Sequence, residues 1–393
     1  MMDSRNRLLT ALAHREPDRV PFDLGGTQVS TIHVAAYRNL CRHLELDPEP
    51  VDMADVVQQV VRPSEELLDR LGVDTRGLFP LTSHNWGFDR LDDIGDAWQH
   101  VDEWGLTQQI KKEHGHWWSQ VGFPLDGEVV NAEALAAYPW PNAADPRRIE
   151  GLREQASAIR AAGKVVVCKG LCAGIFEMAQ RLRGMSNCLC DLLADPDTAT
   201  CLLDNVLRLK IEFWDMLLDE LGDLVDVVAE CDDYGTQQSQ LISYATFKRL
   251  IAPRLSELCR FIKRKHAEKR PPGEPGYLFF HSCGNVRPYL PDFIEMGIDI
   301  LNPVHVTATG MEAGALKRDF GRDLTFWGGG VDTQNVLPKG TPEQVRDDVR
   351  RNVEALMPGG GFVFATVHNI QAEVPPENIV AMWEAMRDVG VYG

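Results

Sequence analysis

Short runs of apolar residues alternate along the chain with longer segments in which apolar residues recur every three or four positions. The uninterrupted runs are typical of strands buried on both faces, as in parallel sheets, and the spaced pattern is typical of the helices that cover such a sheet. Their regular alternation predicts a (β/α)8 barrel of the TIM type, an α/β fold. The eight predicted strands lie within residues 15–26, 71–79, 163–170, 224–229, 277–281, 298–304, 324–330 and 362–366.

Helical segments fill most of the intervals between these strands. The longest begins at residues 195–197 (Asp-Pro-Asp) and continues through Leu221. Asp is a favourable N-cap there, and Pro is tolerated in the first turn. The apolar residues of this helix form one stripe, which we interpret as core packing. Further helices are predicted at residues 5–14, 33–44, 63–71, 341–356 and 377–388.

Residues 81–145 interrupt the alternation. They are rich in Trp, His, Gly and Pro, and the stretches 104–106 and 114–116 resemble hairpin turns. We predict a small β insertion that covers the barrel mouth, within a single domain that spans residues 1–393. His114 and His116 have the spacing of metal ligands, but solvated or stacking roles are favoured for histidines on an exposed hairpin.

Composition and charge narrow the class of protein. The net charge is −18 and the sequence contains no basic patch, so neither nucleic acid nor an anionic membrane is expected as a partner. No apolar run approaches the ~20 residues of a membrane span, and the first residues lack the apolar core of a signal peptide. We therefore expect a cytoplasmic enzyme. The nine cysteines include no C-x-x-C pair, which argues against a disulfide framework or a zinc knuckle.

Polar residues follow several predicted strands, at the end where a TIM-type barrel carries its chemistry. His281 and Cys283 are two residues apart and project to the same side, and an imidazole beside a thiolate suits zinc. With His368 after the last strand, and Glu230 after the fourth, they predict a catalytic zinc site. The alternative is a core histidine and an inert buried cysteine. The other strand-end residues are Asp23, Asp232, Asp233, Asn302 and Asp332, and for Asp232, Asp233 and Asp332 helix capping is an equal alternative.

Several motifs resemble the uroporphyrinogen decarboxylase superfamily. They are residues 15–21 (Arg-Glu-Pro-Asp-Arg-Val-Pro), residues 281–303 beginning His-Ser-Cys-Gly-Asn, the turn at 327–332 (Trp-Gly-Gly-Gly-Val-Asp), and His368 followed by Pro-Pro-Glu-Asn at 375–378. The resemblance covers nearly the whole chain and implies a TIM-type barrel. It also implies one of two activities. The superfamily contains a cofactor-free porphyrinogen decarboxylase and zinc-dependent methyltransferases, which move methyl groups between corrinoid proteins, thiols and methoxylated compounds.

Departures from the decarboxylase pattern favour the methyltransferases. The decarboxylases carry an Arg-Gln-Ala-Gly-Arg loop after the first strand and an aspartate after the second. Here residues 23–28 contain no arginine and residues 78–84 no aspartate. The methyltransferases carry His-x-Cys and a later cysteine. His281 and Cys283 match the pair, and His368, which also matches a decarboxylase histidine, is the nearest candidate for the later ligand.

The leading hypothesis is a zinc-dependent methyl or alkyl transferase, or a demethylase-like enzyme, that acts on a small molecule, a thiol or a corrinoid. The zinc ligands would be His281, Cys283 and His368, with Glu230 as a candidate fourth. Alternatives are a cofactor-free decarboxylase of a less carboxylated substrate and a non-catalytic barrel that binds a corrinoid protein, and a homodimer is left open. Asp232, Asp233 or Asp332 would orient substrate or move a proton, and Asp23, Asn302 and Tyr234 would contact substrate.

Overall fold

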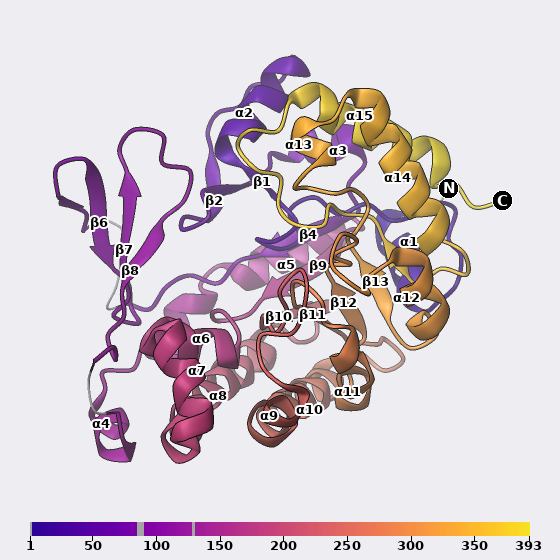
Figure 1. Cartoon of the computed structure of the whole chain (residues 1–393). Helices are drawn as coiled ribbons and strands as arrows, with labels where there is room; N and C mark the ends of the chain where they lie inside the picture. Colours follow the sequence, from indigo (N-terminus) through magenta and orange to yellow (C-terminus); the bar gives the residue numbers. More distant parts are fainter. Residues whose placement is uncertain (1, 85–89, 128–129) are drawn as a thin grey trace.

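The computed structural model describes residues 2–84, 90–127 and 130–393 and shows a curved parallel sheet surrounded by helices (Figure 1). Within these ranges seven strands form the sheet, in the order β14-β13-β12-β11-β10-β9-β4. Strands that neighbour each other in sequence therefore also neighbour each other in space, as the alternating pattern predicts. Their bounds are β4 Thr75–Leu78, β9 Val165–Lys169, β10 Val227–Cys231, β11 Tyr277–His281, β12 Ile300–Asn302, β13 Thr325–Trp327 and β14 Phe362–Val363.

The first predicted strand is not a regular strand. Phe22 forms only an isolated parallel bridge to Phe364. Its backbone N–H donates to the side chain of Asp74 at 2.8 Å instead of to a neighbouring strand, and Pro21 has no N–H to donate. The segment nevertheless contacts both edges of the sheet. The Asp23 N–H donates to the Phe364 carbonyl at 2.9 Å, and the Asp74 N–H donates to the Phe22 carbonyl at 2.9 Å.

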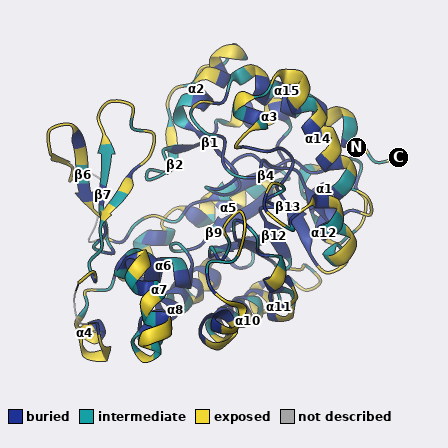
Figure 2. Ribbon diagram, viewed as in Figure 1, coloured by how far each residue is buried: buried dark blue, intermediate teal, exposed yellow. Residues whose placement is uncertain are grey.

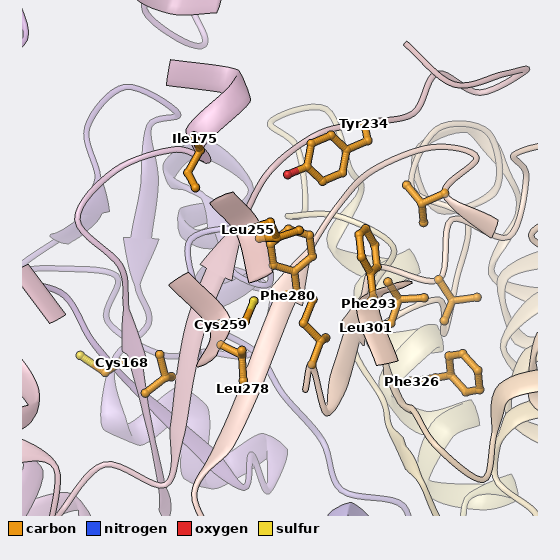
Figure 3. Packing of buried hydrophobic residues seen from close by; sticks show 14 of the residues in the cluster. Cys168, Ile175, Tyr234, Leu255, Cys259, Leu278, Phe280, Phe293, Leu301 and Phe326 are labelled. Carbon is orange, nitrogen blue, oxygen red and sulfur yellow. The ribbon is translucent and has the colours of Figure 1, made fainter. Parts of the chain in front are cut away.

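The two faces of the sheet pack against different partners. Leu278 and Phe280 of β11 belong to the large core formed with the surrounding helices (Figure 3), whereas Phe279 belongs to a smaller cluster on the opposite face. This alternation follows from the two-residue period of a strand. Figure 2 shows the sheet buried and the exposed residues concentrated on the outer sides of the helices and in loops.

The helices that follow the strands agree with the predicted periodic segments. Among the described residues, no helix is both long and apolar enough to cross a membrane. The longer helices are α1 Ser4–Leu12, α2 Val34–His43, α3 Glu65–Leu71, α5 Leu152–Ala161, α6 Ile175–Arg183, α7 Met185–Ala194, α8 Pro196–Leu221, α10 Ala252–Lys269, α11 Leu290–Met296, α12 Ala313–Phe320, α14 Pro342–Leu356 and α15 Pro376–Val389.

The predicted insertion contains a four-stranded antiparallel sheet that projects from one side of the molecule (Figure 1). It contacts the main body through the Trp118 N–H, which donates to the Val57 carbonyl at 2.8 Å. Val57 lies in the turn between β2 (Asp52–Asp55) and β3 (Val60–Arg62), which pair with β1 (Ile32–His33) in a separate small sheet. Residues 85–89 and 128–129 of the insertion lie outside the described residues, and a cover over the barrel mouth stays a prediction. The strands of the insertion are β5 Asp92–Asp93, β6 Ala97–Val101, β7 Thr107–Lys111 and β8 Ser119–Gly122, followed by α4 Ala132–Ala137.

Candidate metal centre

His281, Cys283 and His368 lie together at the carboxyl end of the sheet. His281 is the last residue of β11, Cys283 follows it by two residues, and His368 lies in the loop after β14. One potential ligand atom from each lies within 4.8 Å of the other two. The Nε2 atom of His281 is 3.4 Å from the Cys283 sulfur, and the two imidazole rings are 5.6 Å apart between centroids. The residues that the sequence assigned to one rim are thus close neighbours in space.

The tautomer of His281 is fixed by Asn302, its neighbour in register on β12. The Asn302 amide N–H donates to the Trp327 carbonyl at 2.7 Å, so its amide oxygen faces Nδ1 of His281, 2.5 Å away. An amide oxygen only accepts hydrogen bonds, and Nδ1 must therefore carry the imidazole proton. The lone pair of His281 is left on Nε2, the atom nearest the Cys283 sulfur.

His368 has the same arrangement with Asn369. The Asn369 side-chain N–H donates to the amide oxygen of Gln58 at 2.8 Å, and its own oxygen lies 2.8 Å from Nδ1 of His368. Nδ1 is again the protonated nitrogen, and Nε2 is available to a metal. Burial, assisted by the nearby His281, lowers the pKa of His368 to about 4. His368 is therefore neutral at physiological pH, as a metal ligand must be.

Cys283 adds a sulfur ligand, and Asp233 lies beside it. The Cys283 N–H donates to Oδ1 of Asp233 at 2.8 Å, and the same oxygen is 4.0 Å from Nε2 of His281. Burial, and then the Asp233 carboxylate, raises the pKa of the Cys283 thiol well above its ordinary value. A buried thiolate in this position therefore needs a bound cation to compensate its charge. Two imidazole nitrogens and one thiolate are ligands that suit Zn²⁺.

Glu230 does not lie with these three residues. It is engaged on the helix side of β10, where Lys210 of α8 forms an ion pair with it at 2.8 Å. The indole N–H of Trp214 donates to its other oxygen at 2.5 Å. Glu230 points toward the helices because it lies on the same face of β10 as Val228, which packs in the large core with the helices. Both oxygens of Glu230 thus have partners other than a metal.

Asp232 and Tyr234 are buried in the core beside the metal centre. The carboxylate of Asp232 accepts the backbone N–H groups of Phe176 and Glu177, each at 2.8 Å, and so caps the first turn of α6. It also accepts the Tyr234 hydroxyl at 2.8 Å. Burial raises the pKa of Asp232 to about 7, although these hydrogen bonds oppose the shift. The Tyr234 ring is enclosed by aromatic residues, including Phe280. The side chains of Asp232 and Tyr234 thus bond to α6 and to each other within the core.

The aspartates that follow two other predicted strands, Asp332 and Asp23, accept hydrogen bonds from neighbouring groups. Asp332 accepts the backbone N–H groups of Gln334 at 2.8 Å and Asn335 at 3.2 Å. Asp23 is buried and accepts hydrogen bonds from Gly26, Thr75 and Trp327. Among the strand-end acids of the sequence analysis, Asp233 has a carboxylate oxygen within 4.0 Å of a candidate ligand atom, Nε2 of His281, and its side chain is 39% exposed.

Asn369 and Gln58, which orient His368, were not identified from the sequence. Asn369 directly follows His368, and an amide beside a candidate ligand is a signal that could have been used. Gln58 holds Asn369 from the turn between β2 and β3, and nothing local in the sequence indicates this role. Such outer partners orient metal-binding histidines and fix their tautomers.

Comparison with known proteins places this chain in a family. The family model for uroporphyrinogen decarboxylase (URO-D) matches residues 120–389. A methyltransferase from Methanosarcina mazei has a similar structure, with 19% sequence identity, a TM-score of 0.63 and 99% of each chain covered. A β-glucosidase from Pyrococcus furiosus is less similar: the match covers 95% of this chain and 96% of the glucosidase, at 10% identity and a TM-score of 0.45. No curated protein matches the chain. The match over residues 120–389 shows that this chain belongs to the uroporphyrinogen decarboxylase family.

Proposed function

We propose that this protein is a zinc-dependent methyl or alkyl transferase, or a demethylase-like enzyme, that acts on a small molecule or a thiol. One observation carries the proposal: ligand atoms of His281, Cys283 and His368 converge within 4.8 Å. The asparagines behind both histidines support it, because they leave Nε2 of each ring free for a metal. The structural similarity to a methyltransferase over 99% of both chains is consistent with it.

The zinc would be held by Nε2 of His281, Nε2 of His368 and the sulfur of Cys283. When bound, zinc supplies a Lewis acid that polarises an ether or carbonyl oxygen or favours the thiolate form of a thiol. Three protein ligands leave a coordination position open for substrate. Asp233 can accept the proton that a thiol releases, because it is partly exposed and only 4.0 Å from Nε2 of His281.

The site does not favour decarboxylation of a polycarboxylate. Such a substrate needs cations that bind its carboxylates in a bidentate manner. The loop 23–28 contains no arginine, and Asp23 within it is buried and hydrogen-bonded to Thr75 and Trp327. We therefore propose a methyl donor or acceptor with few carboxylates, and a corrinoid on a partner protein as one candidate methyl carrier.

We also propose that the segment around Phe22 completes an eight-stranded barrel. Hydrogen bonds from this segment to Phe364 and Asp74 join the two edges of the seven-stranded sheet and support this. A closed barrel would place the loops after all strands, and hence His281 and His368, around a single mouth.

The test is the zinc content of the purified full-length chain after dialysis against micromolar zinc and then metal-free buffer. We expect about one zinc per chain in the wild type and sharply less in Cys283→Ser and His368→Ala. Cys190→Ser is the matched control, since Cys190 is exposed and outside the site, and it should keep the wild-type value. A wild type that takes up no zinc, or an equal loss in the control, would refute the proposal. Loaded protein is then assayed for methyl transfer to thiols from methoxylated compounds and from a methylated corrinoid.

A further inference from the structure

His305 carries a buried hydrogen-bond donor that has no acceptor among the described residues. Its Nδ1 accepts the backbone N–H of Gly284 at 3.2 Å, so the ring proton must be on Nε2. The residue is 7% exposed, and Nε2 has no hydrogen-bond partner in the structure. Buried polar groups nearly always have partners, and an exception calls for an explanation.

The position of His305 relates this donor to the metal centre. His305 follows β12, which lies between β11 and β13 in the sheet. Gly284, which holds its ring, is adjacent to the metal-ligand candidate Cys283. Burial lowers the pKa of His305. The nearby carboxylates of Asp332 and Asp233 oppose this shift, and the nearby imidazole of His281 adds to it. His305 in turn contributes to the lowered pKa of His368.

The ring of His305 is held by a rigid backbone. Gly284 has a φ of +82°, in the region that favours glycine. A Cβ atom at this residue would lie 2.5 Å from the carbonyl oxygen of Thr236, so the two backbone segments are in close contact. The Gly284 N–H that binds Nδ1 is therefore fixed in position, and the orientation of the opposite Nε2–H follows from it. A donor held in advance of binding loses little entropy when its acceptor arrives.

We propose that the Nε2–H of His305 donates a hydrogen bond to a neutral oxygen, such as a hydroxyl, ether or carbonyl, of the small molecule that binds at the metal centre. This inference rests on the proposed function. A neutral oxygen is preferred to a carboxylate because Asp233 and Asp332 place negative charge close to the ring. A site built to bind such an oxygen discriminates against analogues that lack it, because the buried donor is then left without a partner.

The test uses thiols that bind the metal through sulfur and differ only at the far end. Full-length chain loaded with Co²⁺ in place of zinc is titrated with ω-hydroxyalkanethiols of two to four carbons, with the corresponding alkanethiols, and with 3-mercaptopropionate. The visible absorption of the cobalt reports binding. We expect at least one hydroxyl compound to bind the wild type roughly 3- to 10-fold more tightly than its alkanethiol, the gain of one neutral hydrogen bond. The carboxylate compound should gain nothing.

Two variants distinguish the hydrogen bond that His305 would donate to the ligand from the one that it accepts from Gly284. His305→Asn can keep an acceptor for the Gly284 N–H but has no distal donor, and His305→Gln keeps a distal donor but no acceptor near Gly284. We expect the hydroxyl gain to disappear in His305→Asn and to persist in His305→Gln. Cobalt binding and alkanethiol affinity should be unchanged in both, and melting temperature should fall only in His305→Gln.

The outcomes separate this inference from the proposed function. If the wild type binds no metal, both fail. If metal and alkanethiols bind but no hydroxyl gain is seen, or if His305→Asn retains the gain, the role of His305 is refuted and the metal centre stands. A larger gain for the carboxylate compound would overturn the preference for a neutral oxygen.

Discussion

Replacing Lys210 by Met should strongly destabilise the fold by breaking one buried ion pair. Lys210 and Glu230 are 2.8 Å apart, with side chains 0% and 2% exposed, so neither charge has access to water. Met fills much of the space of the lysine stem, and the main consequence is that the Glu230 carboxylate is left with the indole N–H of Trp214 alone. Removal of one partner of a buried pair costs about 3–5 kcal/mol. The measurement is denaturant unfolding of the full chain, with thermal melting as a second probe.

A double variant supplies the control for this prediction. Lys210→Met combined with Glu230→Gln removes both charges, while the Gln side-chain oxygen can still accept the Trp214 N–H. Because neutral replacement of a buried ion pair is often tolerated, the double variant should recover most of the lost stability. A single-variant loss below about 1 kcal/mol, or a double variant no more stable than the single, would refute the reasoning.

Glu230→Gln as a single substitution also tests whether Glu230 is a zinc ligand. Glu230→Gln alone should retain the wild-type zinc content, because Glu230 lies on the helix side of β10 with Lys210 and Trp214. Cys283→Ser serves as the positive control for zinc loss. Equal loss of zinc in the two variants would mean that Glu230 is a ligand after all, as the sequence suggested.

Three further predictions concern the support of the site and the stability of the fold. Asn302→Leu removes the group that fixes the tautomer of His281, and zinc affinity measured by competition with a chelator should fall about 10- to 100-fold; an unchanged affinity would contradict this. Gly174→Ala would place a Cβ atom 2.0 Å from Cγ of Asp232 and should cost about 1–3 kcal/mol of unfolding free energy, whereas Gly314→Ala, with no atom within 4 Å, should not destabilise. Burial lowers the pKa of His266 to about 4. The unfolded state therefore binds more protons than the folded state at acid pH. The free energy of unfolding should fall by about 3 kcal/mol as the pH is lowered from 6.5 to 4. His266→Gln should lack this part of the pH dependence of unfolding, and an identical dependence in the two proteins would count against it.

Local sequence pattern determined the order of the strands and two members of the metal centre. Each strand of the main sheet overlaps a predicted strand, because strands buried on both faces are rich in apolar residues. His281 and Cys283 could be paired from spacing alone, since residues two apart in an extended chain project to one side. Their meeting with His368 required only that parallel strands end at the same edge of the sheet.

Tertiary structure decided the features that depend on neighbouring segments. The fourth strand was predicted to end at Ala229, with Glu230 in a loop, but β10 continues to Cys231 and so fixes Glu230 on the helix face. The segment around Phe22 is not a regular strand because Asp74, far along the chain, takes its backbone N–H.

The chemistry of the centre likewise depends on contacts that no local pattern encodes. Asn302 meets His281 through strand register, Gln58 holds Asn369 from a different sheet, and the Gly284 backbone selects the tautomer of His305. Strand propensity and periodicity are properties of a few successive residues, whereas a tautomer, a buried ion pair and an unpaired donor depend on atoms that only folding brings within hydrogen-bond distance.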